Sequence, residues 1–293
     1  MKFEKLGTYA PETINDLEEV QPLDIAQRAS LARLNYIIGF FKKKRPDDFE
    51  SFMNNLQKKY AELSTKNYCD EHKYDIMKSI EKLENLKKYQ KLAIDNLNYV
   101  LQLIDVPENK DWMNDKVKVP QGNYLRSFLV PRYQNVAVIS ETIGREEAIK
   151  LYKIYRTEYA IQTGSETKHK YNTVEELRDD GIEERRKAKG WVRIESLENG
   201  KFYYRRDSCI WADAISDLPD NEFRYLAACY ADFEGTKIHW NPHFVLTMGH
   251  TVARGDPYCS CIVHDTRIDW DLTHPPKEFW DSIWLLHDWQ KKR

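Results

Sequence analysis

The sequence predicts an α+β fold: an N-terminal helical layer followed by a C-terminal domain with a small antiparallel sheet and packed helices. Three observations predict it. Apolar residues recur at helical spacing through the first 105 residues. Extended, aromatic-rich segments flank Asn199-Gly200, a dipeptide typical of a two-residue hairpin turn. Two more extended segments follow near the C-terminus, at residues 243–252 and 258–264.

The helical layer is predicted from three segments, residues 22–45, 47–63 and 75–104, each with one apolar stripe. Pro107 comes just after the third segment, where a helix commonly ends. Such stripes indicate a core or a partner surface rather than a cofactor site. We therefore expect residues 1–106 to form a helical region that covers the functional site or makes a homodimer.

Residues 107–140 are predicted to be a linker or a covering loop, because three prolines and a glycine interrupt them. A helix is expected over residues 141–162, and a loop with a charged helix over residues 163–188. The α+β domain is predicted to occupy residues 141–293.

Within that domain we expect a hairpin that ends at Cys209 and then one helix over residues 219–232. Proline and acidic residues in its first turn suit a helix N-terminus. Cys229 and Asp232 are three residues apart, so a continuous helix would place them on one face. The tail is expected to form a short helix packed on the body, and it carries Trp270, Trp280, Trp284 and Trp289.

Composition excludes several classes of protein. Of the 293 residues, 41% are hydrophobic and 31% are charged, which argues against disorder. The net charge of -2 gives no general attraction to nucleic acid or to an anionic membrane. Neither a signal peptide nor a run of about 18 apolar residues is visible. We expect a cytoplasmic protein with a small-molecule substrate and neither a nucleic acid nor a membrane as partner.

Cysteines give the first functional signal. There are five, an odd number in a long chain, so we expect thiols rather than a disulfide framework. Four of them lie between Cys209 and Cys261, and the first 200 residues hold only Cys69. This clustering directs the search for chemistry to the last third of the chain.

An ordered series of short motifs runs through that region. It consists of Cys209, Cys229-Tyr-Ala-Asp232, Asn241-Pro242 and Gly255-Asp-Pro-Tyr-Cys259. This series resembles the L-2-amino-thiazoline-4-carboxylate hydrolase family over about residues 140–265. The chain departs from the family pattern around His250 and after Cys259, where Ser260 and Cys261 stand in place of an acidic and an aromatic residue. These departures bear on the substrate more than on the fold.

The resemblance implies a hydrolase that acts on a non-peptide C–N bond of a small cyclic amidine, without a cofactor. In the family's reaction water adds to the amidine carbon of a thiazoline, and the ring sulfur then leaves to give an N-carbamoyl cysteine. The same groups serve ring opening and ring closure. The reaction needs a nucleophile or activated water, an acid for the leaving atom and a cation for the carboxylate.

Five residues are candidates for the catalytic roles. A thiolate at Cys229 or Cys259 attacks if a histidine or a helix end lowers its pKa. Asp232 is a candidate general base, or a charge-assisted partner of the amidine. His264 is a candidate proton shuttle, as is His239.

Substrate binding is assigned to a second set of residues. Arg254 or Arg206 is expected to hold the carboxylate, because guanidinium matches its geometry. The other candidates are Cys209, His239 and Asn241.

Three alternatives remain open from the sequence. Any of the cysteines can be a small buried hydrophobe. Cysteine and histidine at these spacings can also bind zinc, although no Cys-x-x-Cys or His-Glu-x-x-His motif is present. A non-enzymatic sensor with a cysteine-rich pocket on a helical dimerisation segment is the third.

Overall fold

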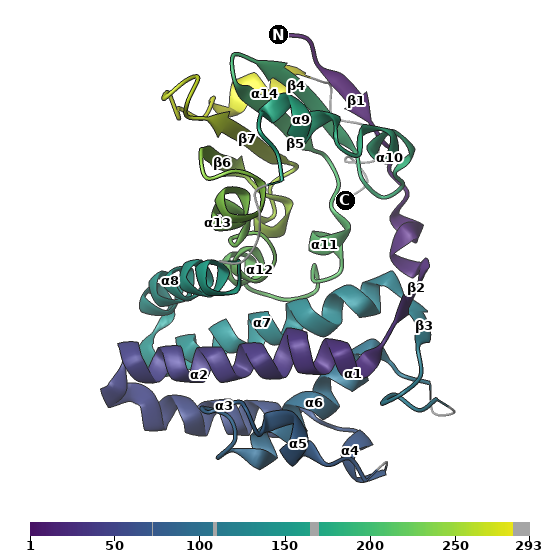
Figure 1. The fold of residues 1–293 in the computed structure, drawn as a ribbon, viewed down its shortest axis with the longest axis vertical. Helices are drawn as coiled ribbons and strands as arrows, with labels where there is room; N and C mark the ends of the chain where they lie inside the picture. The colour runs from purple at the N-terminus through teal and green to yellow at the C-terminus, as the bar shows by residue number, and fades with distance from the viewer. Residues whose placement is uncertain (72, 108–109, 165–169, 284–293) are drawn as a thin grey trace. The chain divides into compact units, whose positions relative to one another are not determined.

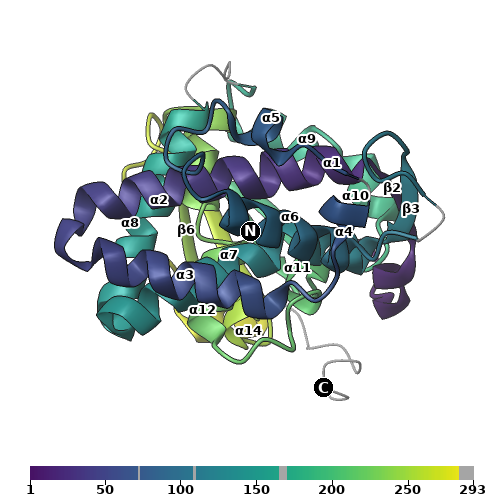
Figure 2. The same ribbon diagram turned by 90° about the horizontal axis from the view of Figure 1, so that it is seen from below.

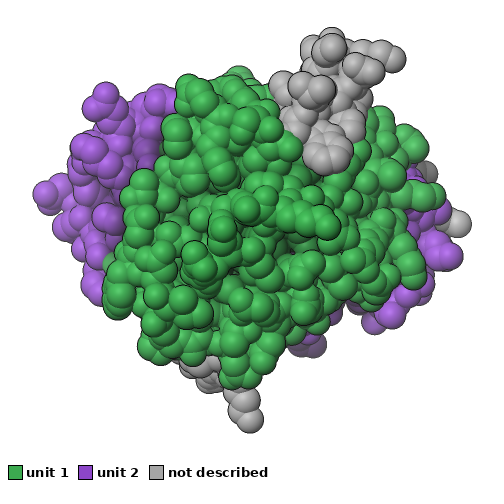
Figure 3. Space-filling view, turned by 90° about the horizontal axis from the view of Figure 1, so that it is seen from above, with its two compact units in different colours: residues 1–14, 156–293 green, residues 15–155 purple. Residues whose placement is uncertain are grey.

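The computed structural model describes residues 1–71, 73–107, 110–164 and 170–283 (Figure 1). Contacts within the chain divide it into two compact units, which Figure 3 colours separately. Unit 1 joins Met1–Ile14 to Arg156–Arg293, and unit 2 is Asn15–Tyr155. This division differs from the boundaries expected at residues 106 and 140. Across the described residues, no helix combines the length and apolar composition that a membrane span requires.

Unit 2 contains the segments at residues 22–45, 47–63 and 75–104, for which the sequence predicts helices. The segment at residues 22–45 forms α1 (Pro22–Asp24), a π-helix (Ile25–Leu31) and α2 (Ala32–Lys44), and α3 (Phe49–Leu63) follows. Helices α2 and α3 lie side by side in both ribbon views (Figures 1 and 2). Their apolar stripes are buried, and Phe41 stacks on Phe52 with ring centroids 4.1 Å apart.

The prediction of one long helix over residues 75–104 is wrong for the first half of this segment. The structure has α4 (Tyr68–Glu71), α5 (Ile76–Ile80), turns, and then α6 (Gln90–Ile104). Asn35 explains the turns, because its Oδ1 accepts the backbone N–H groups of Asn85 and Leu86 at 2.9 and 3.2 Å. A side chain thus replaces the helical acceptors there. The end of α6 agrees with the prediction.

The irregular segment expected over residues 107–140 is also wrong for most of its length. Strand β3 (Val117–Pro120) pairs with β2 (Leu17–Val20), and α7 (Gln121–Ile143) follows directly. Pro120 is the N-cap of α7, where a proline costs little. Pro131 lies inside the helix, and burial of its neighbours outweighs the hydrogen bond that proline removes. Helix α8 (Arg145–Gly164) comes next.

Unit 1 contains a five-stranded antiparallel sheet in the order β1-β4-β5-β7-β6. Its strands are β1 (Glu4–Leu6), β4 (Arg193–Glu198), β5 (Lys201–Arg206), β6 (Phe244–His250) and β7 (Cys259–Asp265). The α+β fold class is therefore confirmed. The edge strand β1 was not predicted, since it comes from the N-terminal region expected to be helical.

The hairpin prediction is confirmed by β4 and β5. Asn199 and Gly200 join these strands with φ of 48° and 72°. Positive φ at both central residues is the type I′ geometry that suits the twist of a two-residue hairpin. Strand β5 ends at Arg206, and Cys209 is the N-cap of α11 (Ile210–Asp213) rather than the end of the extended segment.

The remaining helices of unit 1 are short. They are α9 (Val174–Asp179), α10 (Ile182–Lys187), α12 (Asn221–Ala228), α13 (Asp232–Gly235), a π-helix (Thr236–Trp240) and α14 (Lys277–Ile283). In α14, Trp280 is fully buried, so the tail packs on the body as predicted. Trp284 and Trp289 lie outside the described residues.

The single helix expected over residues 219–232 is divided in two. Its start agrees, because the Asp220 side chain accepts the N–H groups of Glu222 and Phe223. However, α12 ends at Ala228, with Cys229 as its C-cap, and α13 begins at Asp232. The Asp232 N–H still donates to the Cys229 carbonyl at 3.0 Å. The two residues therefore meet across a turn, not on one helical face.

Candidate functional site

One face of the sheet carries both cysteines of β7. Cys259 is paired with Arg206 of β5, and Cys261 is paired with Tyr204. Side chains of directly paired residues point to the same side of a sheet, and every second residue does so along a strand. These four side chains therefore share one face, which we call the cysteine face.

Two more cysteines approach this face from helix ends. Cys209 begins α11 and Cys229 ends α12. Both are electrostatic neighbours of Cys259, and Asp232 is a neighbour of Cys229. The structure thus brings together the four cysteines that cluster in the sequence. Cys69 belongs to α4 of unit 2.

All five cysteines are free thiols, as expected. Burial raises the pKa of Cys229 well above its usual value, and the neighbouring Cys259 and Asp232 raise it further. Burial likewise raises the pKa of Cys259, and that of Cys261 to about 11. Among the described residues, no histidine is a main cause of the pKa shift of Cys229 or Cys259. At neutral pH these groups are therefore thiols rather than standing thiolates.

A small cavity of about 190 Å³, the Asp232 cavity, lies on the cysteine face. Strands β5 and β6 contribute one part of its wall, and α13 with the following π-helix contributes the rest. It is lined by Tyr204, Arg206, Asp232, Gly235, Thr236, His239, Trp240 and Leu246. Three residues singled out from the sequence, Arg206, Asp232 and His239, thus line one cavity.

Arg206 differs from the other candidate arginine in its partners. Its guanidinium lies 5.3 Å from the ring centroids of both Trp191 and Tyr204. In the described part of the chain, no hydrogen bond or ion pair joins this guanidinium to a carboxylate. Arg254 instead donates twice to Glu222, at 2.7 and 3.0 Å, and stacks on Tyr225. Arg206 is therefore the arginine that can receive a substrate anion.

His264 does not belong to the cysteine face. It is paired with Lys201 of β5 and Val245 of β6, so its side chain points to the other face of the sheet. Its Nε2 lies 2.9 Å from the Thr247 hydroxyl, and burial lowers its pKa to about 4. The proton-shuttle role predicted for His264 with the cysteines therefore fails geometrically.

The opposite face carries a continuous chain of imidazoles and hydroxyls. The Thr247 hydroxyl also contacts His274 Nδ1 at 3.1 Å, and His274 Nε2 lies 3.0 Å from the Ser260 hydroxyl. Ser260 in turn lies 2.9 Å from His250 Nδ1. The sequence holds a signal for this hydrogen-bonded chain. Ser260 and His264 are four residues apart in β7 and so point to the same face, whereas Cys259 and Cys261 point to the other.

Asn241 has a structural role. Its Nδ2 donates to the Tyr171 carbonyl at 2.8 Å, and its Oδ1 accepts the His243 N–H at 2.9 Å. Both ends of the amide are thus used to hold the turn that leads into β6. It is not among the residues that line the Asp232 cavity.

The described residues contain no group of three or more histidine, cysteine or acidic side chains arranged to hold a metal ion. The clustered thiols are neighbours, but His250, His264 and His274 belong to the hydrogen-bonded chain on the other face of the sheet. The described residues therefore give no support to the zinc alternative.

A comparison with family models gives one match, to L-2-amino-thiazoline-4-carboxylic acid hydrolase, over residues 127–263. Residues 127–263 of the chain belong to this family. The matched region of this hydrolase family includes Arg206, Asp232 and His239, together with the four clustered cysteines. Comparisons with curated proteins and with solved structures gave no significant match.

Several residues that line the Asp232 cavity are not indicated by the sequence motifs. Tyr204, Thr236 and Trp240 line the Asp232 cavity but carry no motif. The pairing of β5 with β7 could have indicated Tyr204, since it is two residues from Arg206 in an extended segment. The positions of Thr236 and Trp240 depend on the helix break after Ala228, which leaves no such signal.

Proposed function

We propose that this protein hydrolyses a small cyclic amidine that carries a carboxylate, of the 2-amino-thiazoline-4-carboxylate type. One observation carries the proposal: Arg206 and Asp232 line the same small cavity, together with His239. A guanidinium suits a carboxylate and a carboxylate suits an amidine, so the cavity has a complement for each end of such a substrate.

The size of the cavity favours a small substrate. Its volume of about 190 Å³ is below the roughly 300–1,000 Å³ typical of sites for drug-sized ligands. Leu246 and the aromatic rings of Tyr204 and Trp240 supply apolar surface for a flat heterocycle. These features favour a single ring over a peptide or a polymer.

The high pKa values of the thiols favour attack by water over attack by cysteine. In this route Asp232 takes a proton from a water molecule, whose oxygen adds to the amidine carbon across the C=N bond. Asp232 passes that proton to the ring nitrogen. The C–S bond of the tetrahedral intermediate then breaks as its hydroxyl loses a proton to His239 and becomes the carbonyl oxygen of the product. The sulfur receives a proton, for which His239 is the donor, and the product is a ring-opened N-carbamoyl cysteine. Arg206 holds the carboxylate throughout.

Turnover of L-2-amino-thiazoline-4-carboxylate tests the proposal, with N-carbamoyl cysteine measured by chromatography and mass spectrometry. Asp232→Asn is expected to lower kcat by about a hundredfold or more, as loss of a general base does. Arg206→Met is expected to raise KM about tenfold or more, because a charge-assisted contact is lost. Arg254→Met should leave KM unchanged, since Arg254 is paired with Glu222.

Wild-type protein that binds this compound without converting it would contradict the proposal and would favour the sensor alternative. Stoichiometric zinc that is lost together with activity in Cys259→Ser would favour the metal alternative instead. Equal activity in wild type and Asp232→Asn would reject the assigned base.

A further inference from the structure

A second cavity, of about 300 Å³, lies next to the first. We call it the Trp191 cavity, and it is lined by Leu6, Glu184, Arg185, Ala188, Trp191, Arg193 and Arg206. Arg193 is paired with Arg206 across β4 and β5, so both side chains are on the cysteine face. Arg206 lines both cavities and therefore stands at the boundary between them.

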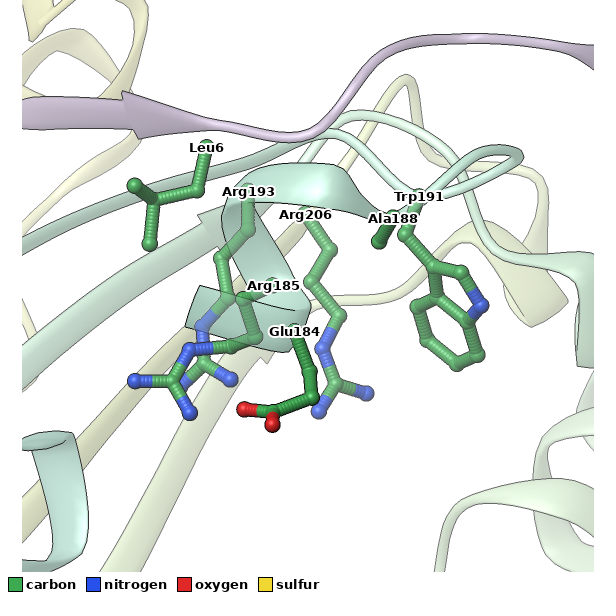
Figure 4. Close-up of a pocket in the computed structure, with 7 residues that line it drawn as sticks. All are labelled: Leu6, Glu184, Arg185, Ala188, Trp191, Arg193 and Arg206. Carbon is green, nitrogen blue, oxygen red and sulfur yellow. The ribbon is translucent and has the colours of Figure 1, made fainter. Parts of the chain in front are cut away.

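Three guanidinium groups reach this cavity, and Figure 4 shows the side chains of Arg185, Arg193 and Arg206 extending in the same general direction. Two of them have a carboxylate partner. Arg193 Nε lies 3.1 Å from Glu195, and an Arg185 nitrogen lies 3.5 Å from the same carboxylate, which is 1% exposed. Among the described residues that line the cavity, Arg206 is the guanidinium without such a partner.

Apart from Glu184, the other walls are apolar. Leu6, Ala188 and the indole of Trp191 face the space, and the Trp191 ring lies against the Arg206 guanidinium. Glu184 also lines the cavity and would repel a second anion beside the one that Arg206 binds. The cavity thus offers apolar contact next to a single available cation, rather than a site for a polyanion.

We propose that the Trp191 cavity takes an apolar, aryl-sized substituent carried next to the carboxylate of the substrate. The inference rests on the proposed function and narrows the substrate class to cyclic amidine carboxylates with an aryl or branched alkyl group. The carboxylate binds Arg206 at the boundary, the amidine lies toward Asp232, and the substituent packs against Trp191 and Leu6. Apolar burial and the ion pair then add to each other.

The test measures the binding of three probes to the full chain by ligand-observed NMR titration. Phenylacetate has both the aryl group and the carboxylate, acetate has only the carboxylate, and benzyl alcohol has only the aryl group. Phenylacetate is expected to bind about tenfold or more tightly than either of the others. Equal affinities for phenylacetate and acetate would overturn the proposal, and so would inorganic phosphate that binds as tightly as phenylacetate.

Variants locate the binding. Ala188→Phe, which fills the cavity, and Arg206→Met, which removes the cation, are each expected to weaken phenylacetate binding about tenfold or more. Arg28→Met is the matched control for the loss of an arginine, because the Arg28 side chain is 82% exposed in unit 2. It should leave binding unchanged. Wild-type affinity for phenylacetate in Ala188→Phe would overturn the proposal, and the probe series gives an independent result if that variant does not fold.

Asp232→Asn separates this inference from the proposed function. It should lower turnover of the thiazoline carboxylate by about a hundredfold or more but retain phenylacetate binding, since Asp232 does not line the Trp191 cavity. A wild-type protein that binds phenylacetate in an Ala188-dependent way without any turnover would reject the proposed function and still support the cavity assignment. Turnover without preference for phenylacetate over acetate would do the reverse.

Discussion

Cys261 and His264 lie three residues apart on β7, and their side chains point to opposite faces of the sheet. The strand alternation that separates them also divides the chemistry of this domain in two. The cysteine face has the Asp232 cavity, whereas the opposite face has the hydrogen-bonded chain that contains His264 and His274. Each face leads to different predictions.

The thiols of the cysteine face are predicted to be dispensable for turnover. Cys229→Ala and Cys259→Ala should retain most of the wild-type kcat, because burial keeps both thiols protonated and water is the proposed nucleophile. Steady-state kinetics of each variant beside Asp232→Asn is the measurement. A covalent substrate adduct on either cysteine, seen by mass spectrometry, would show that a thiol attacks after all.

Removal of the Thr247 hydroxyl should destabilise the protein. Thr247→Val leaves the facing nitrogens of His264 and His274 without their shared partner, which costs about 1–3 kcal/mol for buried polar groups. Urea unfolding measures the change. Ser282→Ala is the control, because Ser282 is exposed and its hydroxyl donates to the Phe279 carbonyl within its own helix. Equal midpoints for Thr247→Val and wild type would show that the chain contributes nothing to stability.

Stability should fall as the pH drops from about 6.5 toward 4. Burial lowers the pKa of both His264 and His274 to about 4, so each stays neutral in the folded state over this range. The unfolded chain, with a histidine pKa near 6.5, binds these protons first. Each histidine then costs at most about 1.4 kcal/mol of unfolding free energy per pH unit.

The comparison that isolates this effect is His264→Gln against wild type, with urea unfolding measured between pH 7 and pH 5. Carboxylates contribute little over that interval, so the variant should show a shallower dependence on pH than wild type. Identical slopes for the two proteins would contradict the prediction.

A side chain at Gly249 is predicted to destabilise the protein. A Cβ placed there would lie 2.6 Å from the His274 ring, which cannot easily move because it stacks on Trp280 and hydrogen-bonds Ser260. Gly249→Ala should therefore cost about 1–3 kcal/mol, as overpacking does. Gly235→Ala is the matched control, since its Cβ would meet only His239, at 3.8 Å. The measurement is the midpoint of thermal unfolding of each variant, compared with that of wild type. Equal midpoints for Gly249→Ala and Gly235→Ala would contradict the prediction.

The helical layer and the hairpin could be read from the sequence because their signals are local. Apolar spacing over residues 22–45 specifies a buried helix face, and Asn199-Gly200 specifies the turn between β4 and β5. The ordered cysteine and aspartate motifs likewise identified the family and the region that holds the candidate site.

Local signals misled where distant contacts outweigh them. Pro131 reads as a helix breaker, yet α7 continues through it because its neighbours are buried. The side chain of Asn35 stops the helix expected before α6. Pairing of β1 with β4 joins segments separated by most of the chain, and no short pattern announces such a contact.

The sequence by itself determined the fold class, the family and the residue types available for catalysis. Only the tertiary structure decided which of these meet. It placed Arg206 at the boundary of two cavities and paired Arg254 with Glu222, although the two arginines were equivalent as candidates. It also placed His264 away from the cysteines. The physical reason is that strand register and ion-pair partners are set by packing between distant segments, whereas composition and spacing report only on neighbours along the chain.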